Sequence, residues 1–98
     1  MRFMQLIETR TSRRDEVQAQ LDEWRTTTAG RRTAQRALTG RDQDRDDVYI
    51  TVVEFPSYEA AMANSELPET RELAARLAKL CDEPPTFRNL DIIRQDDL

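Results

Sequence analysis

The segment Val48–Phe55 is the part of the sequence that most restricts the fold. It is rich in β-branched and aromatic residues, which are enriched in strands. Side chains alternate between the two faces of a strand, and here both faces are apolar except at Thr51 and Glu54. A strand that is apolar on both sides belongs at the centre of a sheet whose two faces are covered. Helices of the same chain can cover one face, and a second subunit is the simplest cover for the other.

The N-terminal third of the chain predicts a strand followed by a helix. Arg2–Thr9 has apolar residues on both faces and predicts a second central strand. Ser12, with Asp15 three positions later, predicts a capping box at the start of the helix. The helix is expected to end around Thr26–Thr28, and Gly30 permits the chain to reverse. An apolar stripe at helical spacing predicts packing against a sheet, and its members are Val17, Leu21 and Trp24.

The rest of the chain continues this alternation of strands and helices. Ser57 predicts a helix cap, and Pro68 suits the first turn of a further helix. We expect a helix break at Asn64–Ser65 and no helix across Pro84–Pro85. The expected elements are an edge strand at Arg32–Thr39, a charged turn at Gly40–Asp47, the central strand, a short helix from Tyr58 to Ala63, a helix with a stripe of Leu73, Leu77 and Leu80, and a last strand at Phe87–Arg94.

The order β-α-β-β-α-β predicts one ferredoxin-like α+β domain over residues 1–98. Right-handed crossovers place the first and third strands at the centre of an antiparallel sheet, with the other two strands at its edges and the helices on one face. A chain of 98 residues has room for one core. No linker, repeat or low-complexity tract divides it. Two copies that cover each other's open face would form a dimeric α/β barrel.

Three segments carry a likeness to a known family. In Val52–Met62 a strand ends in Phe-Pro-Ser and a helix begins with Tyr-Glu-Ala-Ala, and the other two segments are Asn64–Thr70 and Pro84–Asp91. They resemble the dimeric α/β-barrel superfamily, in particular its antibiotic-biosynthesis-monooxygenase-like group of small, uncharacterised proteins. The resemblance implies a homodimer and, for the cofactor-independent monooxygenases of the group, an electron-rich aromatic substrate whose anion reacts with O₂. The shared motifs are structural, so no catalytic residue of the family is carried onto this chain.

Charge and composition exclude several classes of protein. With 19 acidic and 15 basic residues the net charge is -4, which opposes nucleic-acid binding because that depends on Lys and Arg. The basic residues between Arg31 and Arg41 precede aspartates and are interpreted as a solvated strand edge. No stretch approaches the roughly 20 apolar residues that cross a bilayer, and no signal segment is evident. Cys81 is the only cysteine, so no internal disulfide can form and we expect a reducing cytoplasm. Cys81 itself is interpreted as a packing residue.

The residue types that are missing limit the chemistry further. The chain has no histidine, which removes Ser-His and Cys-His nucleophiles, most catalytic zinc sites and a histidine ligand for haem. Asp42, Asp44 and Asp46 have the spacing of a calcium loop. However, Asp47 stands where the loop needs glycine and Val53 where it needs glutamate, so the segment is interpreted as a charged hairpin turn. The two glycines are isolated and form no phosphate loop. We expect no metal and no cofactor.

The remaining candidates are polar and aromatic residues suited to line a pocket between the sheet and the helices. They are Trp24, Tyr49, Tyr58, Asn64 and Asn89. Such side chains can orient an aromatic ring and stabilise its anion. A purely structural interpretation competes with this one and is favoured for three of them. In it Trp24 belongs to the core, Asn64 caps the helix break and Asn89 pairs with strand-end backbone. No catalytic residue is assigned.

Two functional hypotheses remain open, and they differ on whether the protein is an enzyme. The first is a homodimeric, cofactor-independent monooxygenase-like oxidoreductase that acts on a small aromatic or polyketide-like compound. The second is a non-catalytic dimeric α/β barrel that binds a small ligand or serves in a stress response. In both, the partner is a second copy of the chain, and neither involves nucleic acid or a membrane.

Overall fold

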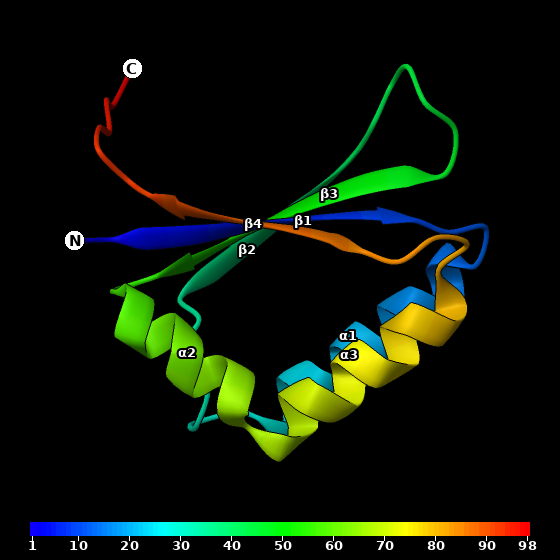
Figure 1. Cartoon of the computed structure of the whole chain (residues 1–98), viewed down its shortest axis with the longest axis horizontal. Helices are drawn as coiled ribbons and strands as arrows, with labels where there is room; N and C mark the ends of the chain where they lie inside the picture. Colours follow the sequence, from blue (N-terminus) through cyan, green and yellow to red (C-terminus); the bar gives the residue numbers. More distant parts are fainter.

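The computed structural model describes residues 1–98 and contains one antiparallel sheet with three helices on one of its faces (Figure 1). The strands lie in the order β2-β3-β1-β4. The predicted ferredoxin-like α+β fold is therefore confirmed, with the first and third strands at the centre. No helix is both long enough and apolar enough to cross a membrane. The elements are β1 (Phe3–Arg10), α1 (Arg14–Thr27), β2 (Arg36–Arg41), β3 (Val48–Phe55), α2 (Tyr58–Glu66), α3 (Pro68–Leu80) and β4 (Thr86–Asp91).

The central strand β3 has the bounds that its apolar pattern predicts. It pairs antiparallel with β1, from Phe3 opposite Phe55 to Arg10 opposite Val48, and with β2 on its other edge. Pro56 ends the strand because proline has no N–H to donate to the ladder. Ser57 then caps α2, and its Oγ accepts a hydrogen bond of 3.1 Å from the amide of Ala60.

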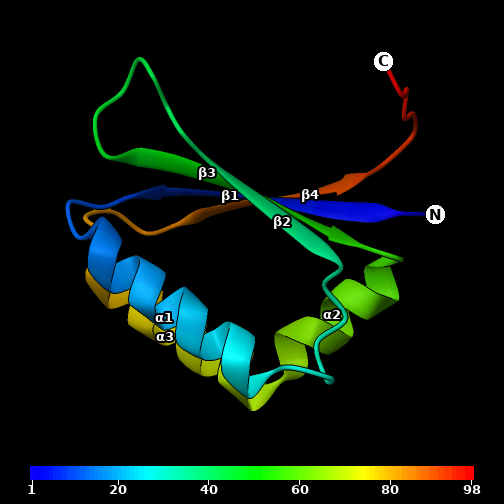
Figure 2. The same ribbon diagram turned by 180° about the vertical axis from the view of Figure 1, so that it is seen from behind.

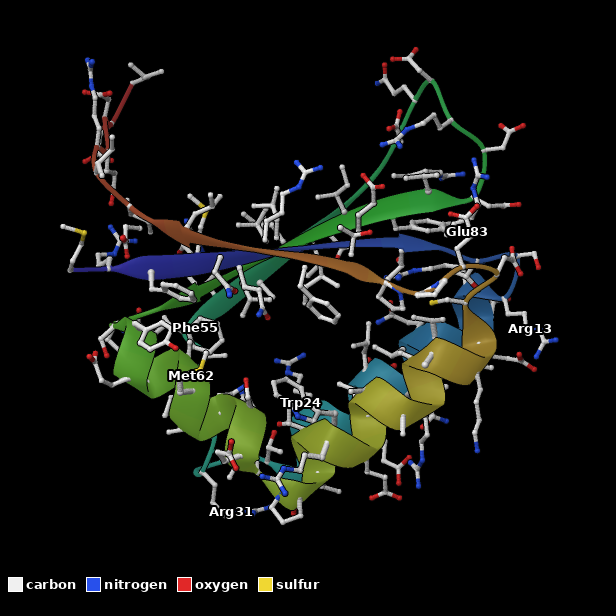
Figure 3. All side chains as sticks on the ribbon, viewed as in Figure 1. Arg13, Trp24, Arg31, Phe55, Met62 and Glu83 are labelled. Carbon is white, nitrogen blue, oxygen red and sulfur yellow. The ribbon has the colours of Figure 1, made fainter.

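The apolar core sits where α2 packs against the sheet. Phe3, Phe55 and Ala61 are buried together, and Val53 and Met62 pack against them. Figure 3 shows Phe55 beneath the sheet and Met62 on α2 turned toward each other. These contacts fix the orientation of the sheet, because the residues that share a face with Phe3 and Phe55 are those that look toward the helices.

The helices cover the sheet unevenly. Helix α2 packs on β3, whereas α1 and α3 pair mainly with each other. Both views show α1 and α3 side by side, and the pair diverges from the sheet toward the end of α3 that adjoins α2 (Figures 1 and 2). The helix-facing side of the sheet is therefore tightly packed at the α2 end and less closely covered beside α1.

The opposite face of the sheet carries no helix (Figure 1). An apolar row crosses three strands on this open face, because Val52 lies between Leu38 on β2 and Leu6 on β1. Met4 and Leu90 form a second pair beside it. Leu38 is 60% exposed and Leu90 39% exposed, although leucine side chains are normally removed from water. The sequence expectation that both faces of the sheet need a cover thus has a structural counterpart.

The start of α1 differs from the sequence prediction. The helix begins at Arg14 with Arg13 as its N-cap, and no side chain caps it. The predicted capping box of Ser12 and Asp15 is wrong. Instead Thr11 is fully buried, and its Oγ1 accepts a hydrogen bond from the Arg13 amide and donates one of 2.7 Å to the carbonyl of Leu80. The partner that selects Thr11 is 69 residues away along the chain.

The other boundaries shift for similar reasons. The edge strand β2 begins only at Arg36 and runs through Arg41, because Thr33 is tied to α2 by hydrogen bonds to Ala60 and Asn64. The predicted break at Asn64–Ser65 is wrong, since α2 continues to Glu66 and α3 starts at Pro68. The last strand is shorter than predicted and ends at Asp91. There are accordingly three helices, in the order β-α-β-β-α-α-β.

Candidate functional site

Two polar pairs lie among apolar side chains in the middle of the helix-facing side of the sheet. Gln5 on β1 donates a hydrogen bond of 3.2 Å from its Nε2 to Oδ1 of Asn89 on β4. The hydroxyls of Thr39 on β2 and Thr51 on β3 lie 2.9 Å apart. A face that served only as a core would carry apolar side chains at all of these positions. Polar groups that look toward covering helices are typical of a ligand site, where a few of them fix orientation and specificity.

A groove of about 690 Å³ opens between α1 and this face of the sheet. We call it the α1 groove. Thr39 belongs both to its wall and to the Thr39–Thr51 pair on the sheet, so the two features adjoin each other. The helix contributes Arg14, Gln18 and Leu21, and the sheet contributes Thr39, Gly40, Arg41 and Tyr49.

The sequence explains why these side chains meet. Arg14, Gln18 and Leu21 stand at the i, i+4, i+7 spacing, which puts them on one face of α1. On the sheet, Arg41 lies opposite Tyr49 and Thr39 opposite Thr51 in the β2–β3 ladder. Alternation then aims these strand residues toward α1. The groove forms where one face of the helix and one face of the hairpin are brought together.

Tyr49 forms the aromatic part of the groove. The guanidinium carbon of Arg14 lies 4.9 Å from the centre of the Tyr49 ring, a distance at which cation–π attraction operates. The same guanidinium donates a hydrogen bond of 2.9 Å to Oε1 of Gln18. Tyr49 is therefore held between helix and sheet, and the groove combines an aromatic ring, an apolar side chain and several hydrogen-bonding groups.

Trp24 lies farther along α1, half-buried, in the space between the helices and the sheet (Figure 3). Its Nε1 donates a hydrogen bond of 2.9 Å to Oγ1 of Thr70 on α3. The guanidinium of Arg32 lies 5.7 Å from its ring centre and is fixed by hydrogen bonds from Nη1 to the carbonyl of Arg25 and the hydroxyl of Thr28. Trp24 thus has a structural anchor on α3 and a cation against its ring.

Asn64 is 7% exposed and sits on the inner side of α2. Its Oδ1 accepts a hydrogen bond of 3.3 Å from the amide of Thr33, so it does not serve the helix end as a cap. Because a backbone N–H can only donate, this contact fixes the oxygen and leaves Nδ2 as a free donor. Arg32 and Thr33 are neighbours, so the segment that approaches Trp24 also approaches Asn64.

The five candidate residues therefore divide into separate places. Trp24 and Asn64 are linked through the loop after α1, and Tyr49 lies in the α1 groove. Asn89 pairs with the Gln5 side chain on the sheet. Tyr58 is 52% exposed, and its ring packs edge-on against Phe3 with centroids 5.7 Å apart. No hydrogen bond or ring contact joins any two of the five.

Sequence reasoning missed the residues that surround Tyr49 in the groove. The charge pattern predicts that Arg41 belongs to a solvated strand edge, and it indicates no function for Arg14 and Gln18. The signal available was the shared helix face of Arg14, Gln18 and Leu21. It could not be used without knowing that this face meets the end of β2.

Two other clusters have structural explanations. Backbone and side-chain hydrogen bonds from Asp44 and Arg45 hold the pKa of Asp42 below its usual range, and Arg45 also pairs with Glu8. The predicted charged turn is therefore an ion-paired one, and no group of three metal-binding side chains forms. Burial, with a smaller effect from Asp82, raises the pKa of the Cys81 thiol, which makes the reactive thiolate rarer.

Comparison with known proteins identifies the fold but no sequence family. No family model matches the chain, and no curated protein matches it. Solved structures do match. SnoaB, a cofactor-independent oxygenase from Streptomyces nogalater, aligns with a TM-score of 0.80 and 14% identity over 96% of this chain and 95% of its own. Rv0793 from Mycobacterium tuberculosis aligns with a TM-score of 0.81 and 14% identity over 99% of this chain and 100% of its own.

A further structure, of an antibiotic biosynthesis monooxygenase, aligns with a TM-score of 0.74 and 13% identity over 94% of this chain and 99% of its own. The resemblance noted in the sequence is thus matched by structural neighbours in that group. Identities this low establish a shared fold, and the activity has to be argued from the residues of this chain.

Proposed function

We propose that the protein is a cytoplasmic homodimer that binds a small aromatic or polyketide-like compound in the α1 groove and oxidises it with O₂ without a cofactor. The groove is the observation that carries the proposal. It offers Tyr49 and Leu21 to an aromatic ring and Gln18 and Thr39 to its polar substituents. The likeness in fold to a solved cofactor-independent oxygenase supports this reaction class.

The homodimer is proposed from the exposed surface. The single chain exposes 6961 Å², whereas a folded monomer of 11.4 kDa typically exposes about 5,800 Å². The excess of roughly 1,200 Å² per chain is of the size that obligate dimers remove from water. Only 8 of the 98 residues are buried, and the apolar row of Leu6, Leu38 and Val52 lies on the face without helices. A second copy packed on this face would leave both α1 grooves on the outer, helix-covered sides.

The chemistry follows from what the groove can stabilise. An anthrone or a phenol must first lose a proton, and its electron-rich anion then reduces O₂. For an anthrone, one oxygen atom replaces two hydrogens at the methylene carbon to give a ketone, and the other oxygen leaves as water. Arg14 and Arg41 place positive charge in the groove, and a nearby positive charge favours the ionised form of a bound acid. The protein's contribution is to bind, orient and ionise the substrate.

Oxygen uptake with a panel of hydroquinones and anthrones tests this proposal. We expect uptake above the rate without protein for at least one compound. Tyr49→Ala should reduce it at least tenfold, because truncation removes the ring contact in the groove. Tyr58→Ala is the matched control, since this tyrosine lies outside the groove, and it should keep the rate. Trp24→Ala reports whether the Trp24 and Asn64 region also contributes. Absence of oxygen uptake with every compound would refute the proposal that the protein is an oxygenase.

A non-catalytic dimeric α/β barrel that binds a small ligand is the second candidate. It is favoured by the number of candidate side chains already committed to protein partners, namely Trp24 to Thr70, Asn64 to Thr33 and Asn89 to Gln5. Ligand binding that depends on Tyr49 but consumes no oxygen would establish it.

A further inference from the structure

We propose that the compound bound in the α1 groove carries an anionic group, a carboxylate or its equivalent, that is held by Arg14 and Arg41. This inference rests on the proposed function, because it presupposes that the groove binds an aromatic ring. It adds the chemical class of the substituent and the two residues that select it.

The charge of the groove is opposite to that of the protein. The chain as a whole has a net charge of -4, yet the groove is lined by two arginines and by no aspartate or glutamate. A cleft lined by charges of one sign raises the local concentration of oppositely charged ligands. A groove in an acidic protein that keeps only positive charge is suited to an anion.

Neither arginine is neutralised within the chain. Most arginines of this protein form ion pairs with carboxylates, as Arg31 does with Glu69 and Arg36 with Glu54. No carboxylate oxygen lies within 4.0 Å of the guanidinium nitrogens of Arg14 or Arg41. The only side-chain acceptor bound to Arg14 is the neutral amide of Gln18. Both guanidinium groups therefore keep donors free for a ligand.

The acidic loop beside the groove does not supply the missing counter-charge. Arg41 also borders a second hollow that contains Asp42, Asp46 and Asp47. Asp42 is bound by Arg45 at 2.8 Å, and none of the three forms an ion pair with Arg41. The aspartates instead restrict the anion to the side of Arg41 that faces α1, where Arg14 stands over Tyr49 at 4.9 Å.

The two arginines also have suitable geometry. They flank Tyr49 from two elements, since Arg14 comes from the first turn of α1 and Arg41 lies opposite Tyr49 at the end of β2. A guanidinium can bind a carboxylate through two parallel hydrogen bonds. An aromatic acid could thus place its ring against the side chains of the groove and its carboxylate between the two cations.

Calorimetric titration of the 98-residue protein with 2-naphthoate and with 2-naphthamide tests the inference. The two probes share the ring and differ in the charge of the substituent. We expect the acid to bind about tenfold more tightly, as is usual for hydrogen bonds to a charged group. Arg41→Gln and Arg14→Gln should remove this difference, and Arg41→Lys should restore part of it because the charge remains. Added salt should lower the affinity for the acid and leave the affinity for the amide unchanged.

The control variant is Arg13→Gln, which makes the same change in net charge at a neighbouring position. Arg13 is exposed, pairs with Glu16 at 3.9 Å and does not line the groove, so the preference for the acid should persist. Equal affinities for the acid and the amide would show that Arg14 and Arg41 do not select an anionic group, although the groove would still bind an aromatic ring. If neither probe binds, this inference is wrong, and oxygen uptake that depends on Tyr49 then decides the proposed function separately. Circular dichroism of each variant confirms that it is folded.

Discussion

Replacing Val52 by aspartate tests whether the open face of the sheet is a dimer interface or is exposed to water in a monomer. Val52 lies in the middle of the apolar row, between Leu38 and Leu6, on the face that no helix covers. In a monomer an aspartate here would point into water. In a dimer it would be buried, and the short side chain could not reach the solvent. A two-fold axis would place one such charge on each side of the interface.

The expected effect in the dimer is large. An uncompensated buried charge costs several kcal/mol, and we take about 2.5 kcal/mol for each copy as a low estimate. Two copies then weaken association by about 5 kcal/mol, which raises Kd by more than a thousandfold. In a monomer the same substitution would cost only about 1 kcal/mol of folding free energy, through the lower strand propensity of aspartate.

Sedimentation velocity at micromolar concentration distinguishes these cases. We expect the wild type and Val52→Thr, which keeps the branched shape, to sediment as dimers. Val52→Asp should sediment as a folded monomer or fail to fold, and far-ultraviolet circular dichroism distinguishes these two outcomes. A wild-type monomer, or a Val52→Asp protein that stays dimeric, would show that the open face is not the interface.

Three further predictions concern stability and are measured by urea unfolding. Ser57→Ala should lower the free energy of unfolding by about 1 kcal/mol, because it removes the hydroxyl that caps α2; an unchanged midpoint would contradict this. Gly30→Ala should cost about 1–2 kcal/mol because Gly30 has a φ of 81°, whereas Gly40→Ala should cost less, because Gly40 has no positive φ. The hydrogen bond from Arg31 holds the pKa of Glu69 below its ordinary value of 4.5. The wild type should therefore have a larger free energy of unfolding than Glu69→Gln above pH 4.5, and this difference should disappear as the pH falls through the lowered pKa of Glu69. A difference that persists in strong acid would exclude the Arg31–Glu69 pair as its cause.

Those parts of the fold that depend on local patterns were predictable from the sequence. The bounds of β3 follow from an apolar run that Pro56 closes, and the start of α3 follows from Pro68. The start of α1 was not predictable, because Thr11, which precedes the helix, is held by the carbonyl of Leu80 at the far end of α3. In the same way, α2 continues through the polar residues Asn64–Ser65 because Asn64 is buried against Thr33. Tertiary contacts override local propensity at both places.

The candidate site was less accessible from sequence than the fold. Tyr49 could be named because an aromatic residue in a central strand faces one of two layers. Its neighbours Arg14 and Arg41 could not, because they stand 27 positions apart in sequence and meet only when α1 crosses the end of β2. That Arg14 and Arg41 lack ionic partners can be seen only from the three-dimensional positions of the carboxylates. A count of charges gives the sign of the whole chain and hides the opposite sign of the groove.

We infer that the two faces of one sheet have different tasks, the open face for a second copy and the helix-facing side for the ligand. Amide chemical-shift mapping of the ¹⁵N-labelled protein during titration with 2-naphthoate distinguishes the two faces. We expect the largest shifts at Gln18, Thr39, Gly40 and Tyr49, around the α1 groove. Shifts centred instead on Leu6 and its neighbours on the open face would contradict the assignment of both surfaces.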